Sequence, residues 1–323
     1  MKAIQVYNLG GPDVLAYKDI EISQPGPGEV RVRNHAIGVN YTDVYMRTGT
    51  FPPPRLPYTP GKEGAGEVLA VGEGVTDFVP GDRVAYVETL GAYAAESNVP
   101  LHYLVHLPEG IPYETAAAMM LKGLTAQFLV RKTFRVEKGH TILVHAAAGG
   151  VGQILIQWAK HLGAVVIGTV GSPEKAEIAR HLGCDHVINY RQEDFAKRVD
   201  ELTNGEKCHV VYDSVGQSTF EGSLDCLRPL GYFVSFGLAS GPIPPFDLMR
   251  LAEKGSLFAT WQALPTHLAK RKDMLSMSKQ LFDIVLDGTV TIQDPVCLSL
   301  EAAAEAHRRL EARDRISTVV LQP

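Results

Sequence analysis

The segment TILVHAAAGGVG, residues 141–152, decides the fold that this 323-residue chain is expected to adopt. Thr141 is followed by the apolar residues 142–144, as in a buried strand, and the alanine- and glycine-rich stretch after them is typical of a tight turn. Beyond the turn, Val151, Ile154, Leu155 and Trp158 recur at helical spacing. A strand, a glycine turn and an amphipathic helix in this order favour a dinucleotide-binding unit over the alternative of a purely structural turn.

Strand and helix segments continue to alternate after this unit. Strands are expected at residues 165–169, 186–188, 209–213, 231–236 and 256–260, with a helix at 173–182. Alternation of this length predicts an α/β fold with a doubly wound parallel sheet of the Rossmann type.

The N-terminal part of the chain has a different character. It is rich in glycine and proline and carries short β-type runs at 30–33, 67–71 and 83–87, which predict a compact, β-rich, barrel-like domain. A helix is expected at 114–130, where the rhythm of the sequence changes.

The C-terminal tail breaks the strand–helix alternation after about residue 265. Two helices, 272–287 and 300–312, are expected before a final strand at 317–321, which is a candidate to complete the first domain. The expected division is therefore residues 1–124 with 266–323 as one domain and residues 125–265 as the other.

Composition excludes several classes of protein. The net charge is −5, from 31 basic and 36 acidic residues without a dense basic stripe, so neither nucleic acid nor an anionic membrane is an expected partner. No segment has the apolar length of a secretory leader or a membrane span. Cysteines 184, 208, 226 and 297 form no CxxC pair, which favours buried free thiols in a cytoplasmic protein.

The residues after the second expected strand indicate which nicotinamide is bound. NAD-selective sites carry an acid at that strand end, whereas this chain continues from Thr169 through Gly171, Ser172 and Pro173. Ser172 and Pro173 suit the start of a helix, and Lys175 then falls in its first turn, where the helix dipole disfavours a cation. A 2′-phosphate beside Lys175 would reverse that penalty, so we expect NADPH. The alternative is a solvated lysine offset by Glu174.

Metal binding is not expected. The pair His102 and His106 has i, i+4 spacing, but it lies in a short β-like run that ends at Pro108 rather than in a helix.

With these features in place, the chain resembles the zinc-independent quinone oxidoreductase branch of the medium-chain dehydrogenase/reductase superfamily, the branch that includes zeta-crystallin. The resemblance covers essentially the whole length. Besides the glycine turn, it rests on AIGVNYTDVY (36–45), GKEGAG (61–66), VPGDRV (79–84), LKGLTA (121–126), VYDSVG (211–216) and SFG (235–237). Zinc-dependent relatives place a ligand cysteine at the position of Asn40 and a ligand histidine at that of Lys62. Both metal ligands are therefore replaced.

The resemblance implies a GroES-like catalytic domain beside the Rossmann domain, with the nicotinamide held between them, and it favours a homodimer. It also implies the residues that contact NADPH. These are Asn40, Tyr41, Tyr45, Thr125, Phe128, Gly149, Gly150, Val151, Gly171, Ser172, Lys175, Tyr190, Ser214, Phe236, Gly237, Leu238 and Arg313. Thr125 and Phe128 are expected at the start of a crossing helix. Trp261 stands where family members often carry arginine, which either removes a cofactor contact or reshapes the pocket.

The expected reaction passes a hydride from NADPH to a quinone and leaves an oxyanion that is protonated. Asn40, Asp43 and Tyr45 are the candidate catalytic residues, with Asn40 or Tyr45 stabilising the oxyanion and water supplying the proton. A quinone accepts hydride without a Lewis acid, consistent with the missing ligands. The alternatives without a functional role are that Tyr45 is a packed aromatic ring, that Asp43 caps a turn and that Phe236 belongs to the hydrophobic core. Two other functions stay open, an enone or alkenal double-bond reductase and a non-catalytic, NADPH- and RNA-binding, crystallin-like protein.

Overall fold

The computed structural model describes residues 1–312 and 318–323, which form two compact units. The first consists of Met1–Leu124, Leu268–Leu286 and Thr291–Pro323, and the second of Thr125–His267 and Asp287–Val290. Among the described residues, no helix combines the length and the apolar character needed to cross a membrane.

The second unit is built on a parallel sheet of six described strands, in the order β10-β9-β8-β11-β12-β13. The strands are β8 (Thr141–Val144), β9 (Val165–Val170), β10 (His186–Asn189), β11 (Cys208–Asp213), β12 (Leu227–Ser235) and β13 (Phe258–Trp261). In chain order this is third, second, first, fourth, fifth and sixth, the strand order of a doubly wound sheet. The prediction of a Rossmann-type α/β fold is confirmed.

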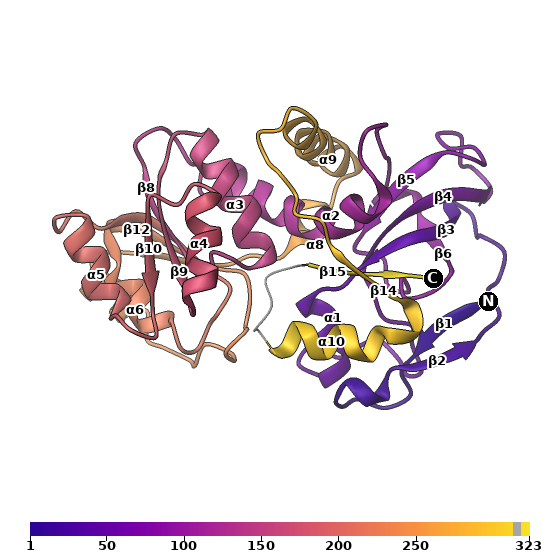
Figure 1. The fold of residues 1–323 in the computed structure, drawn as a ribbon, viewed down its shortest axis with the longest axis horizontal. Coiled ribbons are helices and arrows are strands. Elements are labelled where there is room, and N and C mark those ends of the chain that lie inside the picture. The colour runs from indigo at the N-terminus through magenta and orange to yellow at the C-terminus, as the bar shows by residue number, and fades with distance from the viewer. Residues whose placement is uncertain (313–317) are drawn as a thin grey trace. The chain divides into compact units, whose positions relative to one another are not determined.

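Helices cover both faces of this sheet. They are α3 (Gly150–His161), α4 (Pro173–His181), α5 (Phe195–Leu202) and α6 (Phe220–Asp225). Figure 1 shows α3 and α4 on one face and α5 and α6 on the other. Buried side chains of the strands, such as Leu143 and Phe233, pack with Phe220 and Leu224 of α6 in one hydrophobic core. The shorter helices α7 (Met249–Glu253) and α8 (Leu264–His267) follow β12 and β13.

The first unit contains a largely antiparallel sheet of seven described strands. Its order is β14 (Val296–Ser299), β15 (Val319–Gln322), β3 (Glu29–Gly38), β4 (Glu63–Val71), β5 (Arg83–Val87) and β7 (Leu104–His106), and β6 (Glu96–Pro100) also pairs with β3. Because β15 pairs with β3, the C-terminal tail does return to the N-terminal sheet. A separate hairpin pairs β1 (Lys2–Gln5) with β2 (Ala16–Asp19).

The helices of the first unit include α1 (Tyr41–Thr48), α9 (Arg271–Leu286) and α10 (Ala303–Ala312). The helix α2 (Tyr113–Phe128) is shorter than the predicted 114–130 at its end, because a π-helical turn (Leu129–Thr133) follows it. The predicted helix 300–312 likewise begins as a 3-10 turn (Leu300–Ala302) before α10. Two further 3-10 turns lie at Pro12–Val14 and Leu101–Tyr103.

Candidate functional site

The glycine turn lies at the carboxyl end of β8 and leads directly into α3. Gly149 is the N-cap residue of the helix, and its backbone N–H donates to the carbonyl oxygen of Ala146 at 2.8 Å. A Cβ on Gly152 would lie 2.5 Å from the oxygen of Ala146 and 2.7 Å from that of Ala147. Any side chain at position 152 would therefore push the backbone of the turn away from the first turn of α3. The turn therefore places backbone atoms where a side chain would otherwise stand.

This turn meets the requirements of a pyrophosphate cradle. The first N–H groups of a helix have no partner within the helix, and they sit at the positive end of its dipole. In α3 these groups belong to Gly150, Val151 and Gly152, and neither Gly149 nor the two glycines carry a side chain that would cover them. The arrangement suits the diphosphate of a dinucleotide.

The next strand along the chain, β9, is also followed directly by the start of a helix. After β9, Ser172 is the N-cap of α4, its hydroxyl accepts the N–H of Lys175 at 3.4 Å, and Pro173 is the first helical residue. This confirms the expected cap and places Lys175 in the first turn of the helix. A Cβ on Gly171 would lie 2.5 Å from the hydroxyl of Tyr190, so the half-exposed Tyr190 stands directly over Gly171.

Two further loops meet at the same edge of the sheet. Ser214 directly follows β11, and Phe236, Gly237 and Leu238 directly follow β12. The N–H of Phe236 donates to the oxygen of Asp213 at 2.9 Å, and the N–H of Ala239 donates to that of Ser214 at 3.1 Å. The structure therefore brings these residues together at the carboxyl ends of the strands, where ligands of such sheets bind.

A buried polar network in the second unit, which was not predicted from the sequence, holds the loops at this edge of the sheet. The Asp213 carboxylate accepts the N–H groups of Val215 and Gly216 at 2.7 and 2.9 Å, and the hydroxyl of Ser223 at 3.0 Å. Ser223 and Thr169 contact the two ring nitrogens of His145, at 3.0 and 2.9 Å.

Burial lowers the pKa of His145, while the negative charge of Asp213 opposes that change, so the histidine is neutral at pH 7. The network joins the ends of β8, β9 and β11. A signal was present in the sequence, because His145 and Asp213 are polar residues at the ends of apolar strands.

In the first unit, Asn40 is held by a buried acid. It is the N-cap residue of α1, and its side-chain amide donates to Glu63 at 2.7 Å. The other carboxylate oxygen of Glu63 accepts the N–H of Leu121 at 2.7 Å, and the ammonium of Lys122 lies 3.7 Å from the oxygen that accepts from Asn40. Glu63 is fully buried, which raises its pKa, and Lys122 opposes the rise. Neither Glu63 nor Lys122 was predicted, although a lysine within the apolar helix α2 was a signal.

Asp43 does cap the first turn of α1, as one of the alternatives proposed. Its carboxylate accepts the N–H of Asn40 at 2.9 Å and the hydroxyl of Tyr93 at 3.2 Å. Asp43 is buried, so it does not reach the surface of the unit. Burial raises its pKa to about 7, and the hydrogen bonds from Asn40 and Tyr93 oppose that rise.

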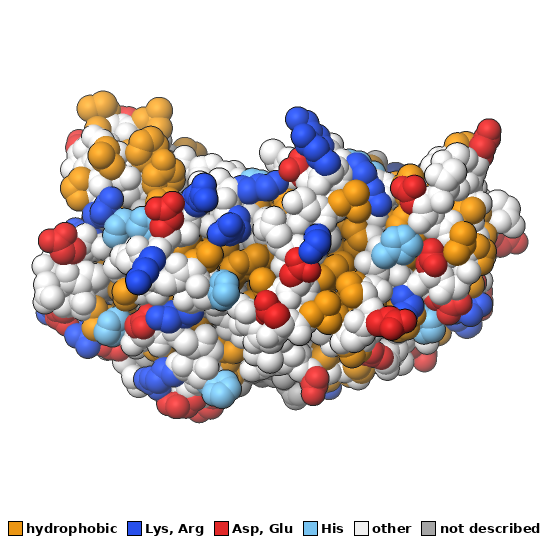
Figure 2. Space-filling model, turned by 90° about the horizontal axis from the view of Figure 1, so that it is seen from above, with side chains coloured by type: hydrophobic (Ala, Val, Ile, Leu, Met, Phe, Trp, Pro, Cys, Tyr) orange, Lys and Arg blue, Asp and Glu red, His pale blue; other side chains and the backbone are white. Residues whose placement is uncertain are grey.

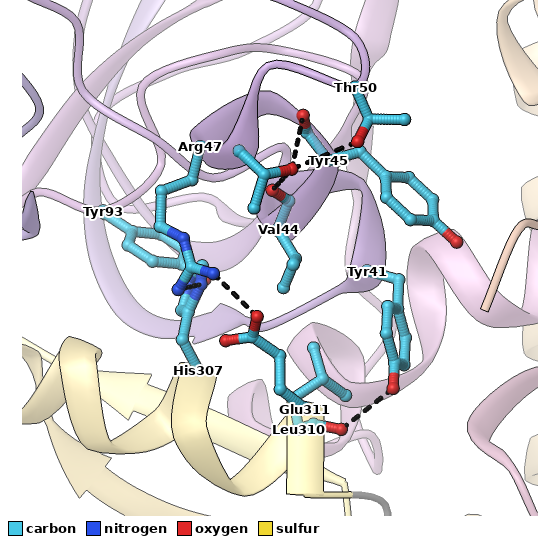
Figure 3. A network of polar contacts seen from close by, with 10 residues as sticks. Tyr41, Val44, Tyr45, Arg47, Thr50, Tyr93, His307, Leu310 and Glu311 are labelled. Carbon is cyan, nitrogen blue, oxygen red and sulfur yellow. Dashed lines mark hydrogen bonds and ion pairs between the residues drawn. The ribbon is translucent and has the colours of Figure 1, made fainter. Parts of the chain in front are cut away.

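Tyr41 and Tyr45 lie on the same side of α1, with ring centres 6.0 Å apart (Figure 3). The hydroxyl of Tyr41 donates to the carbonyl oxygen of Leu310 on α10 at 3.0 Å. Tyr45 packs edge-on against Phe51, with ring centres 5.5 Å apart. Tyr45 is therefore partly a packed aromatic residue, and its role in catalysis stays a prediction.

Two of the predicted cofactor contacts lie on the helix α2. Thr125 and Phe128 lie at the end of α2, not at the start of a helix as expected, because the helix begins at Tyr113. Both are buried, and the ring of Phe128 stacks on His267 with centres 4.1 Å apart. Arg313 lies outside the described residues. Trp261, at the end of β13, is 45% exposed.

The two histidines of the candidate metal pair contact different carbonyl groups. Nε2 of His102 lies 2.7 Å from the oxygen of Leu268, and Nε2 of His106 lies 3.0 Å from that of Asp77. Lys62 pairs with Glu88 at 2.9 Å. In the described ranges 1–312 and 318–323, no three His, Cys, Asp or Glu residues are grouped to hold a metal ion.

A doubly wound sheet with a glycine turn that suits a pyrophosphate, in one chain with a second unit built on a β-sheet, is the domain combination of medium-chain dehydrogenases and reductases. Comparison with known proteins supports this class. Residues 26–111 match the alcohol dehydrogenase GroES-like domain family, and residues 150–271 match the zinc-binding dehydrogenase family.

Individual relatives are similar over their whole length. A quinone oxidoreductase of Pseudomonas aeruginosa is 51% identical over 100% of this chain and 99% of its own. A 2-haloacrylate reductase of Burkholderia is 44% identical over 99% and 98%. The structure of Escherichia coli quinone oxidoreductase complexed with NADPH is 43% identical, covers 100% of both chains and has a TM-score of 0.98. The chain belongs to the quinone oxidoreductase family, a zinc-independent branch of the superfamily.

Proposed function

We propose that this chain is an NADPH-dependent quinone reductase that works without zinc. The observation that carries the proposal is the pair of helix starts at the carboxyl edge of the parallel sheet, a glycine cradle at α3 and a lysine-bearing first turn at α4. The relatives named quinone oxidoreductase, and the related structure that is complexed with NADPH, support it.

The residues of the second unit fit this cofactor. The backbone N–H groups of Gly150 and Val151, beside the N-cap residue Gly149, would hold the pyrophosphate, and Lys175 with Ser172 would hold the 2′-phosphate. Tyr190, which stands over Gly171, would border the adenosine. We propose that the two compact units are the catalytic and the cofactor-binding domains. NADPH, when bound, supplies the hydride.

In the first unit, Asn40 is the best placed group to stabilise a developing oxyanion. A side-chain amide carries two hydrogens, and Glu63 takes one of them. The second hydrogen is left to donate elsewhere, and the buried carboxylate fixes its direction. The hydroxyl of Tyr41 is already used by Leu310. We assign Asp43 to positioning Asn40 rather than to substrate contact, because its buried carboxylate accepts the backbone N–H of Asn40 and the hydroxyl of Tyr93.

The test is NADPH oxidation by chelator-treated protein with a small quinone, with NADH in parallel. We expect turnover that prefers NADPH and survives the chelator. Asn40→Ala should lower kcat by roughly 100-fold, the effect of removing one oxyanion donor. An unchanged kcat in Asn40→Ala would remove Asn40 from the mechanism, and loss of turnover with the chelator would contradict zinc independence.

A second candidate is reduction of a conjugated carbon–carbon double bond. The 44% identical relative named 2-haloacrylate reductase favours it. The kcat/KM values for a quinone and for an α,β-unsaturated acid, measured on one preparation, decide between the two.

We propose further that two copies associate through β13, the edge strand of the described parallel sheet. An edge strand offers unpaired N–H and C=O groups, and here Phe258 and Trp261 on that strand are 50% and 45% exposed. Leu248 and Met249, at the start of α7, are 75% and 63% exposed, so the second unit carries several large apolar side chains at its surface. Light scattering should show a dimer in the wild type and a monomer in Phe258→Lys; a monomeric wild type would contradict the proposal.

The surface and the thiols bear on partners and compartment. Figure 2 shows acidic and basic side chains interspersed over the visible face, which does not favour a nucleic acid partner. All four cysteines are free, which supports a cytoplasmic location. The prediction that all four are buried is wrong for Cys297, which is exposed because it lies near one edge of the first unit's sheet, on β14.

A further inference from the structure

A chain of buried polar groups connects helices α1 and α10 of the first unit (Figure 3). The Arg47 guanidinium lies 3.3 Å from Nδ1 of His307, and Nε2 of His307 lies 3.0 Å from the hydroxyl of Tyr93. That hydroxyl lies 3.2 Å from the Asp43 carboxylate. We call Arg47, His307, Tyr93 and Asp43 the α1–α10 relay; all four are buried.

Proton accounting fixes the direction of these hydrogen bonds. A guanidinium only donates, so Nδ1 of His307 must accept from Arg47. The neutral ring then carries its proton on Nε2 and donates it to the Tyr93 oxygen, which leaves the Tyr93 hydroxyl to donate to Asp43. Burial, with Arg47 nearby, lowers the pKa of His307 to about 3, which agrees with a neutral ring. Every bond therefore points toward the carboxylate and favours its ionised form.

The relay also holds the residue proposed to act in catalysis. The Asp43 oxygen that accepts from Tyr93 also accepts the backbone N–H of Asn40. One turn further along α1, Arg47 donates to Glu311 of α10 at 2.7 Å. The hydroxyl of Tyr41, at the other end of α1, donates to Leu310 of α10. Hydrogen bonds therefore connect both ends of α1 to α10.

Other groups around Asp43 set the background for its titration. Glu63 raises its pKa and Lys62 lowers it, both by charge. Tyr58 is close enough for the Asp43 charge to affect its pKa, which burial raises to about 12. Among the described residues, the Tyr58 hydroxyl has no hydrogen-bond partner. Tyr93 is therefore the neutral side chain that stabilises the carboxylate directly, and Arg47 acts on it through His307.

We propose that Tyr93, His307 and Arg47 are positioning residues, which keep the Asp43 carboxylate in place to hold Asn40 for hydride transfer to the quinone. The inference rests on the proposed function. It assigns a role in the reaction to three side chains that do not touch substrate or cofactor, and it makes that role depend on the charge of Asp43.

The test follows the Asn40 backbone amide by NMR in asparagine-labelled protein as the pH changes. In the wild type we expect this resonance to titrate near pH 7 with Asp43, and the acid limb of the kcat profile to have the same midpoint. Because a hydrogen bond to the charged form lowers a pKa, Tyr93→Phe should move both midpoints upward by about one pH unit. It should also lower kcat roughly tenfold without changing the Kd for NADPH.

Matched variants separate positioning from mere stability. Tyr58→Phe removes a buried hydroxyl that makes no hydrogen bond to Asp43, so both midpoints should stay in place. His307→Gln offers a carbonyl oxygen that accepts and an NH2 group that donates, and it should recover much of the kcat that His307→Leu loses. An Asn40 resonance that does not follow Asp43, or a kcat profile that does not move with it in Tyr93→Phe, would overturn the inference. A wild type that reduces no quinone would instead refute the proposed function, and the Asn40 titration would still decide whether the relay acts on Asn40.

Discussion

The buried pair of Glu63 and Lys122 offers a direct test of how the Asn40 site is held. Lys122→Met keeps most of the apolar stem but removes the ammonium, which lies 3.7 Å from a fully buried carboxylate. Removing one partner of a buried pair costs about 3–5 kcal/mol, because the remaining charge is left uncompensated. The Lys122 side chain is 10% exposed and its contact is long, so we expect the lower end, about 3 kcal/mol at pH 8.

The penalty should depend on pH with a defined sign. Burial raises the pKa of Glu63 above its unfolded value, so the folded state binds the extra proton and the free energy of unfolding falls as the pH rises. Losing Lys122 raises that pKa further. The cost of Lys122→Met should therefore shrink as the pH is lowered from about 8 toward 5.

Urea unfolding followed by circular dichroism at several pH values measures this cost. Lys279→Met is the control, because it breaks an exposed ion pair with Asp283 and should cost at most about 0.5 kcal/mol. Adding Glu63→Gln to Lys122→Met should recover part of the loss, with a coupling of about 1–3 kcal/mol. A cost below about 1 kcal/mol that is the same at all pH values would show that the carboxylate does not depend on Lys122.

Three further outcomes test other parts of the structure. Lys175→Ala should weaken NADPH binding by about 1.5–3 kcal/mol and leave NADH binding unchanged, measured by fluorescence titration; an unchanged NADPH/NADH ratio removes the argument for Lys175. Gly152→Ala should weaken NADPH binding at least roughly tenfold, since its Cβ would lie 2.5 Å from a backbone oxygen, whereas Gly11→Ala, with open space around it, should bind normally. An aromatic disulfide reagent should label Cys297 quickly in the native chain, and the three buried thiols only after denaturation; fast labelling of a second thiol would contradict the burial of Cys184, Cys208 and Cys226.

The sequence predicted the parallel sheet well because its signals are local. Apolar strands, a glycine turn and helix caps such as Ser172 all act within a few residues, and the structure confirms them in the predicted order. Boundaries were less accurate: β12 begins at Leu227, four residues before the expected start, and α2 gives way to a π-helical turn. The C-terminal tail was only a candidate to complete the first domain, and its strand β15 pairs with β3 of that domain.

The candidate site divides in the same way. By itself, the sequence placed the proposed cofactor-binding residues at one edge of the sheet, because they directly follow strands whose carboxyl ends share one edge in any doubly wound sheet. Only the tertiary structure decided how Asn40 is held. Glu63, Tyr93 and His307 are far from Asn40 in sequence. The pairing of β4 with β3 and the packing of α10 into the core of the first unit bring them together. Hydrogen bonds between such distant groups leave no periodic pattern in a sequence, because each depends on burial that exists only after the whole unit has folded.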